Sequence, residues 1–228
     1  LAGSKFLFDG QYHFNIYGTL KAIGAETDSI IFDNFGEEKW QGFTLDNVSD
    51  ETEFRYVRIS GAEKDNGGGM FLGGSDPILS HITISGNTAE SYGGGMYISE
   101  SVPILSHITI SGNTAEWGGG GMVIEFSDPI LTNVTINGNT ANYGGGMSVW
   151  SSDPIVSHIT ISGNTAELGD GGALYVWNSD PILSHVIISG NTAGLFGGGM
   201  YLDNSDPTLT YVIISGNTAE LGDGGALY

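Results

Sequence analysis

The sequence repeats itself with a period of about 26 residues, and this period restricts the chain to solenoid architectures. The prolines follow one another at spacings of 26, 26, 25, 27 and 26 residues, and a column of asparagines after glycine keeps the same spacings. One unit reads Pro-Ile-Leu-Ser-His-Ile-Thr-Ile-Ser-Gly-Asn-Thr-Ala, then a variable loop, then Gly-Gly-Gly-Met-Tyr-Ile. Six such units, with part of another at each end, make up most of the chain.

The residues within a unit are typical of β-strands. Polar and β-branched residues alternate from His81 to Ser85, and Gly, Asn and Pro interrupt them at regular points. One unit is too short to bury its own apolar face, so Ile82 and Ile84 must stack on their equivalents in the next unit. We therefore predict an all-β fold, a single-stranded right-handed parallel β-helix with about 26 residues per coil.

Each coil is expected to hold three short strands, which in the first full unit are residues 79–84, 88–89 and 96–98. Ile82, Ile84, Met96 and Ile98 should point inward, and Tyr97 should point outward. Glycine allows a tight corner before the third strand. Proline fits only at the corner that closes the coil, because it cannot donate to a strand ladder.

The repeat predicts two regions. Residues 1–66 lack the repeat but alternate in the same way, so we expect irregular N-terminal coils that cap the β-helix. Residues 67–228 should form six regular repeats plus a partial last coil. The last residues, 224–228, stop within a unit, which predicts an uncapped sheet edge. We expect other copies, or further repeats of a longer protein, to pair with it end to end.

Composition and charge exclude several classes. The 38 glycines are clustered rather than placed at every third position, which excludes collagen, and the 39% of hydrophobic residues argues against disorder. Without cysteine, the chain has no disulfides or thiolate metal sites. The net charge is −20, and all six Lys and Arg residues lie in the first 64 positions. Such an acidic surface repels phosphate backbones, so we expect no nucleic-acid partner, and no apolar run is long enough to predict membrane insertion.

The repeat units resemble those of known surface proteins. Residues 84–87 (Ile-Ser-Gly-Asn), with Gly-Gly-Ala-Leu at 171–174 and 224–227, resemble the F-x-x-N and G-G-A-[ILV] repeats of polymorphic outer-membrane proteins. The chain is similar more broadly to secreted bacterial right-handed β-helix proteins with a pectin-lyase-like fold. It departs from these repeats in having Ile for Phe, and Met in most units for the Ala-[ILV] pair. The resemblance implies an extracellular or cell-surface protein, often adhesive.

The same fold also hosts polysaccharide lyases and hydrolases, so an enzyme is the alternative to weigh. Lyases that abstract a proton beside a uronate carboxylate need a cationic group, and residues 65–228 contain no Lys or Arg. No Asp-Asp pair of the kind that hydrolases of this fold use is present. Active sites also interrupt a repeat, whereas these coils look regular. We therefore predict no enzyme activity and no cofactor.

Two columns contain residue types that bind metals. Asp128, Asp153 and Asp180 precede prolines, where Asp ordinarily bonds to the turn backbone, and Ca²⁺ bridging adjacent coils is the alternative. The histidine column offers two adjacent pairs that could share a divalent ion. Asn and Tyr replace His in other coils, which favours an exposed face that merely tolerates His. The histidines are His81, His107, His158 and His185.

Two further columns have structural explanations. The asparagines after glycine should form an inward or corner ladder in which each amide bonds its neighbour. A complete column of threonines from Thr88 to Thr218 is consistent with an ice-binding face, but β-propensity explains it equally well. The asparagine ladder consists of Asn87, Asn113, Asn139, Asn164, Asn191 and Asn217.

Outward aromatic residues are the strongest indication of a binding surface. We expect them to form a flat strip on the third strand and the loop before it, which suits stacking on sugar faces or burial against a partner. The alternative is that the rings fold back over the glycine-rich backbone. The predicted ligand-binding residues are Tyr97, Trp117, Trp150, Tyr175, Trp177 and Tyr201.

The sequence as a whole predicts a non-enzymatic scaffold at the cell surface or outside the cell, an adhesive or fibre-forming segment of a longer protein or assembly. The rival interpretation is a carbohydrate-binding or polysaccharide-degrading β-helix module, and a minor alternative is an ice-binding protein. Glycans are therefore expected partners alongside other copies of the chain.

Overall fold

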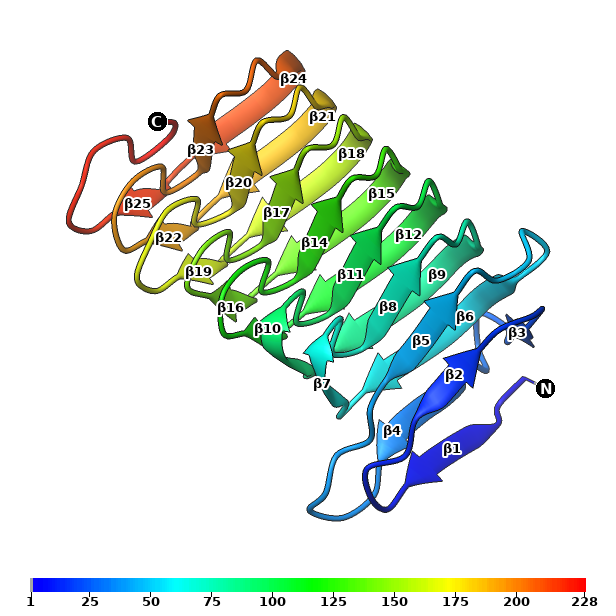
Figure 1. Cartoon of the computed structure of the whole chain (residues 1–228). Helices are drawn as coiled ribbons and strands as arrows, with labels where there is room; N and C mark the ends of the chain where they lie inside the picture. Colours follow the sequence, from blue (N-terminus) through cyan, green and yellow to red (C-terminus); the bar gives the residue numbers. More distant parts are fainter. Residues whose placement is uncertain (1) are drawn as a thin grey trace.

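Each repeat unit folds into one coil, and the coils stack into three parallel sheets (Figure 1). The computed structural model describes residues 2–228. The first sheet has ten strands, the second has seven and the third has eight. All strand pairs within these sheets are parallel, such as Ile82 with Ile108 in the first sheet and Met96 with Met122 in the third. The predicted all-β parallel solenoid is therefore confirmed.

The strands follow one another around the coil from the first sheet to the second and then the third (Figure 1). The first sheet consists of β1 (Lys5–Phe8), β3 (Lys21–Ile23), β4 (Ile30–Asn34), β6 (Glu53–Ser60), β9 (Ile78–Ser85), β12 (Ile104–Ser111), β15 (Ile130–Asn137), β18 (Ile155–Ser162), β21 (Ile182–Ser189) and β24 (Thr208–Ser215). The second consists of β7 (Glu63–Asn66), β10 (Thr88–Tyr92), β13 (Thr114–Ala115), β16 (Thr140–Ala141), β19 (Thr165–Ala166), β22 (Thr192–Ala193) and β25 (Thr218–Ala219). The third consists of β2 (Phe14–Ile16), β5 (Phe43–Asp46), β8 (Met70–Gly73), β11 (Met96–Ser99), β14 (Met122–Glu125), β17 (Met147–Trp150), β20 (Leu174–Trp177) and β23 (Met200–Asp203).

The core is a set of apolar ladders along the axis of the stack. Ile82, Ile84, Met96 and Ile98 are fully buried, as the alternation predicted. Leu79 is buried too, because His81 adopts a left-handed backbone conformation with φ of 54° and bends the strand. The predicted alternation covered His81 to Ser85, where it holds, and did not extend to the residues before this corner. Histidine is among the few residue types that tolerate this region.

The regular coils begin earlier than the sequence repeat does. Strand β6 pairs residue by residue with β9, from Glu53 opposite Ile78 to Ser60 opposite Ser85. Tyr56 has φ of 52° and so makes the same corner as His81. The predicted boundary at residue 66 therefore falls inside a coil. A strand joins the stack when its inward positions are apolar. Residues 53–60 meet this condition although they lack the other residues of the repeat.

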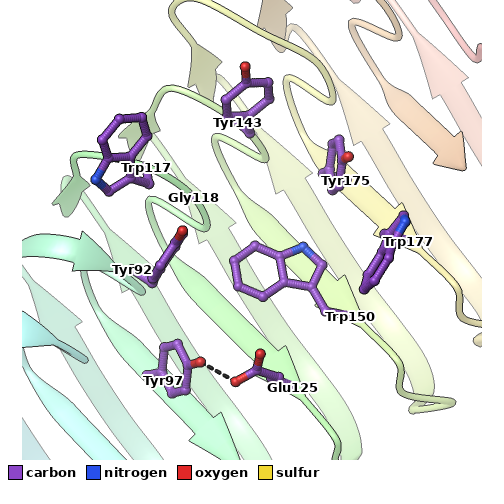
Figure 2. A pocket seen from close by; sticks show the side chains of 9 residues that line it. All are labelled: Tyr92, Tyr97, Trp117, Gly118, Glu125, Tyr143, Trp150, Tyr175 and Trp177. Carbon is purple, nitrogen blue, oxygen red and sulfur yellow. Dashed lines mark hydrogen bonds between the residues drawn. The ribbon is translucent and has the colours of Figure 1, made fainter.

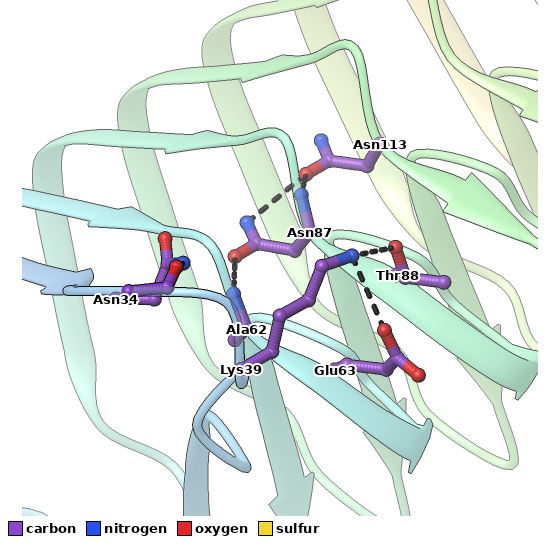
Figure 3. Close-up of polar contacts among 8 residues, drawn as sticks. Asn34, Lys39, Ala62, Glu63, Asn87, Thr88 and Asn113 are labelled. Carbon is purple, nitrogen blue, oxygen red and sulfur yellow. Dashed lines mark hydrogen bonds and ion pairs between the residues drawn. The ribbon is translucent and has the colours of Figure 1, made fainter. Parts of the chain in front are cut away.

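A buried asparagine ladder runs along the turn between the first and second sheets. The Asn139 side-chain nitrogen donates to Oδ1 of Asn164 at 3.0 Å and to the Ile110 carbonyl at 3.1 Å. Its own Oδ1 accepts from the backbone and side-chain nitrogens of Asn113. The ladder reaches the N-terminal coils through Asn87, whose Oδ1 accepts from the Ala62 amide (Figure 3). The amides thus occupy the buried corner that their spacing predicted.

A second polar ladder was missed in the sequence. At the corner after the third sheet, the amide of each serine donates to the hydroxyl of the serine one coil further on, as from Ser101 to Ser127 at 3.0 Å. The hydroxyl of Ser101 in turn donates to the Ser99 carbonyl at 2.7 Å. The serines recur in the sequence two residues before each proline, but their type alone did not indicate burial. In the regular coils, the corners at both ends of the first-sheet strand are therefore fixed by buried side-chain hydrogen bonds.

Candidate functional site

The regular stacking breaks on the outer face of the third sheet. Tyr97 of β11 pairs with Val123 of β14, which is followed along the stack by Ser148 of β17 and then Tyr175 of β20. Two small residues thus separate two tyrosines within one outward column. A gap two coils long is left in the row of rings. Val123 and Ser148 are themselves fully buried there, and the Trp150 ring lies beside Ser148 at Gly118.

Aromatic residues from the loops and from the ends of the strands surround this gap (Figure 2). Trp150 and Trp177 lie on adjacent strands, next to the tyrosine column, and loops between the second and third sheets contribute rings from the other side. We call this hollow the aromatic dish, and its volume is about 450 Å³. Its lining consists of Tyr92, Tyr97, Trp117, Gly118, Glu125, Tyr143, Trp150, Tyr175 and Trp177.

The rings hold one another at right angles rather than in one plane. Tyr92 and Trp150 meet edge to face with centroids 5.1 Å apart, and Tyr143 and Tyr175 do so at 6.1 Å. Trp150 crosses the backbone at Gly118, where a Cβ atom would lie 3.2 Å from its ring. Edge-to-face pairs of this kind are favourable and orient the rings. The dish is therefore a preformed surface with differently oriented faces.

Glu125 supplies the charge of the dish. The Tyr97 hydroxyl donates a hydrogen bond to Oε2 of Glu125 (Figure 2). Burial, together with this hydrogen bond and the nearby carboxylate charge, holds the pKa of Tyr97 well above its usual value. Burial likewise raises the pKa of Tyr175 to about 12. Both hydroxyls therefore stay neutral at physiological pH, while the carboxylate carries the negative charge.

Comparison with known proteins identifies the fold family. Residues 41–142 and 106–228 each match the family described as right handed beta helix region, so the matches together span most of the chain. The chain belongs to the right-handed beta helix family. No curated protein matches the sequence, so the family gives the fold and no activity. The resemblances to pectin-lyase-like proteins and to polymorphic outer-membrane repeats stay predictions. Among residues 2–228, no helix is long and apolar enough to cross a membrane.

The right-handed beta helix brings five of the six predicted ligand-binding residues together, but not as a flat strip. Tyr97, Trp117, Trp150, Tyr175 and Trp177 all line the dish, whereas Tyr201 stacks on the far side of Tyr175 at 5.2 Å and lies outside it. The strip is not flat, because Val123 and Ser148 interrupt the outward column and the rings around this gap meet at steep angles. Tyr97 is also only 8% exposed, in contrast to Trp117 at 48% and Trp177 at 46%. The predicted alternative, rings folded over glycine backbone, applies to Trp150.

Sequence reasoning missed three parts of the dish. Glu125 stands between Ser99 and Trp150 in its column, and Gly118 provides the backbone that Trp150 covers. The third part is the pair of smaller residues, Val123 and Ser148, that leave the gap in the outward column of rings. The signal was available, because Val123 and Ser148 replace the aromatic residue found at the same place in four other coils: Phe71, Tyr97, Tyr175 and Tyr201.

The aspartate column connects neighbouring coils. The Asp153 amide donates to Oδ1 of Asp128, and the Asp180 amide to Oδ1 of Asp153, both at 2.7 Å. The aspartates thus bond to turn backbone, as expected, but to that of the next coil, because parallel stacking brings its equivalent amide within reach. Each carboxylate thus already has a structural role that needs no ion. Residues 2–228 contain no group of three His, Cys, Asp or Glu side chains arranged to hold a metal ion.

The histidines form two stacked pairs. The rings of His81 and His107 lie 4.5 Å apart and 2° from parallel, and those of His158 and His185 lie 4.7 Å apart. A ring nitrogen donates its lone pair in the plane of the ring, so two face-to-face rings do not converge on one ion. This geometry favours an exposed stacking face over the shared metal site that was the alternative.

Proposed function

We propose that this right-handed beta helix is a non-catalytic, extracellular or cell-surface scaffold whose aromatic dish binds carbohydrate. The observation that carries the proposal is the dish itself, a preformed hollow in which two exposed tryptophans, further aromatic rings and one carboxylate converge. Adhesion through a bound glycan follows directly from such a surface. End-to-end pairing with other copies stays a prediction.

The lining suits both the apolar C–H groups and the hydroxyl groups of a sugar. The C–H face of a pyranose packs on aromatic rings, and its hydroxyls need donors and acceptors at the rim. The indole nitrogens of Trp117 and Trp177 can donate, and the Tyr175 hydroxyl can both donate and accept. The Tyr97 hydroxyl donates its proton to Glu125 and can accept from a ligand. A volume of about 450 Å³ lies within the usual range for small-molecule sites, and accommodates a short oligosaccharide segment rather than a long chain.

The chemistry of the dish supports binding without cleavage. Hydrolysis of a glycosidic bond ordinarily uses two carboxylates on opposite sides of the bond, and Glu125 is the single carboxylate among the lining residues. Lyase chemistry on a uronate needs a cation to neutralise the substrate, and no Lys or Arg occurs after residue 64. The predicted polysaccharide-degrading alternative therefore lacks support from the dish.

Isothermal titration with neutral oligosaccharides, chosen from a glycan array, tests the proposal. We expect saturable binding that is lost in Trp117→Ala and in Trp150→Ala. Tyr211→Asn is the matched control, because it removes a ring that is 76% exposed outside the dish, at a position where another coil has Asn133. Binding that survives both tryptophan changes, or an array on which no glycan binds, would overturn the proposal.

A further inference from the structure

We infer that the ligand of the dish carries an ammonium group seated between the Glu125 carboxylate and the aromatic rings, which makes an amino sugar the substrate class. This inference rests on the proposed function and specifies its ligand. It depends on the position of one carboxylate, on the absence of a cation beside it, and on an ammonium group bound to the same row of rings one coil away.

The Glu125 carboxylate is held in place at the edge of the dish. It lies at the end of β14 and is partly buried, and its Oε2 atom accepts the hydrogen bond from Tyr97. Tyr97 is itself fixed, because its ring stacks on Phe71 with centroids 5.6 Å apart and planes 15° from parallel. A carboxylate oriented in this way presents its charge at a constant position.

No cation of the protein pairs with this carboxylate. The ion pairs formed within residues 2–228 use Glu51, Glu53 and Glu63, all of them in the N-terminal coils. Glu125 therefore carries an unpaired negative charge against a largely apolar hollow. A partly desolvated charge of this kind is stabilised when a ligand brings the opposite charge.

The same row of rings binds an ammonium group elsewhere in this structure. The Lys64 amine lies 5.2 Å from the centre of the Phe71 ring, and Phe71 is the ring that stacks on Tyr97. This distance is within the range of a cation–π interaction. In the dish, Trp117, Trp150 and Tyr92 offer ring faces and edges but have no lysine beside them. An incoming ammonium group would find there both the π faces and the carboxylate.

The overall charge excludes the opposite ligand class. Residues 65–228 hold 15 acidic residues and no Lys or Arg, so their formal charge is −15. Uronic acids and sulfated or phosphorylated sugars would be repelled both by this field and by Glu125 at close range. Neutral sugars would stack on the rings but would leave the carboxylate without a charged partner.

The test compares matched hexasaccharides by isothermal titration at a mildly acidic pH, where free amines are protonated. The probes are the β1,4-linked hexamers of glucosamine and of N-acetylglucosamine, with the galacturonic acid hexamer as the anionic comparison. We expect glucosamine hexamer to bind about tenfold or more tightly than the N-acetyl hexamer, as a charged hydrogen bond typically gives. We expect no binding of the galacturonate.

Glu125→Gln should abolish the preference for the amine, because it removes the charge and keeps an oxygen that accepts from Tyr97. Glu167→Gln is the matched control, since it removes one exposed charge from the same acidic surface outside the dish. It should leave the preference unchanged. A preference lost equally in both variants would assign it to the general field and overturn the inference.

The outcomes separate the inference from the proposed function. Equal affinity for the amine and the N-acetyl hexamers would overturn the ammonium site and leave carbohydrate binding intact. If no hexasaccharide binds, the amino-sugar ligand fails, and the proposed function fails with it when no glycan of the array binds either. Titration with tetramethylammonium tests the ammonium site by itself. Binding that Glu125→Gln removes supports the site, and the absence of binding overturns it.

Discussion

Removing one amide from the middle of the asparagine ladder should destabilise the whole stack. In Asn139→Ala, the backbone amide of Asn113 loses the Oδ1 acceptor at 2.9 Å, and the Ile110 carbonyl loses its donor at 3.1 Å. Asn113 and Asn164 each lose one further side-chain bond at 3.0 Å. Each buried polar group left without a partner costs about 1–3 kcal/mol. With two backbone groups affected, we expect the free energy of unfolding to fall by about 2–6 kcal/mol.

Urea denaturation followed by circular dichroism measures this loss, with Asn137→Ala as the control. Asn137 is on the same coil and its side chain is partly exposed, with no side-chain hydrogen bond to another described residue. The control should change stability by less than about 1 kcal/mol, as surface substitutions usually do. If Asn139→Ala were no more destabilising than Asn137→Ala, the ladder would contribute nothing beyond a filled corner, and the reasoning from buried amides would be refuted.

Three other changes test different parts of the structure. Gly120→Ala should prevent regular stacking, because its Cβ would lie 2.5 Å from the Gly145 carbonyl oxygen. Gly138→Ala has open space around its Cβ but φ of 60°, so it should lower the free energy of unfolding by only about 1–2 kcal/mol. Thermal denaturation of the two variants separates these outcomes. Burial lowers the pKa of Lys64 from 10.5 to about 8, so between pH 8 and pH 10 the unfolded chain binds more protons than the folded one. The free energy of unfolding should therefore rise over this pH range. Urea denaturation at several pH values measures the rise, which should be smaller in Lys64→Met. Ser148→Tyr should displace the Trp150 ring, because Ser148 is fully buried beside that ring at Gly118. Glycan binding should then be lost in titration calorimetry, and thermal denaturation measures how far the stack itself is destabilised.

The fold could be read from the sequence because every coil obeys the same two constraints. Inward apolar positions such as Ile82 and Ile84 must stack on equivalents, and turn residues such as Asn87 must recur at the same place. Period and residue type are sufficient for both. The corner at His81 could not be read in the same way, because its left-handed backbone depends on pairing with the next coil and histidine does not demand that conformation.

The dish was only partly predictable, for a physical reason. The aromatic residues were recognised by type, but their arrangement depends on side-chain directions that the period does not determine. Trp150 turns toward Gly118 and meets Tyr92 edge to face, which brings a strand residue and a loop residue together. Glu125 gave no signal by itself, since one more acid in a chain with 26 acidic residues is unremarkable in sequence.

In a solenoid, a site arises where the repeat is broken on the outside while it is kept on the inside. Met122 and Met147 continue the inward ladder without interruption, and the neighbouring Val123 and Ser148 interrupt the outward tyrosine column. Stability and binding are thus encoded by alternate residues of the same strands, because successive side chains of a strand point to opposite faces. The sequence looked too regular to hold a site because its regularity was judged mainly from the inward and turn positions. When the outward positions are considered alone, the repeat is broken at strands β14 and β17, where the dish lies.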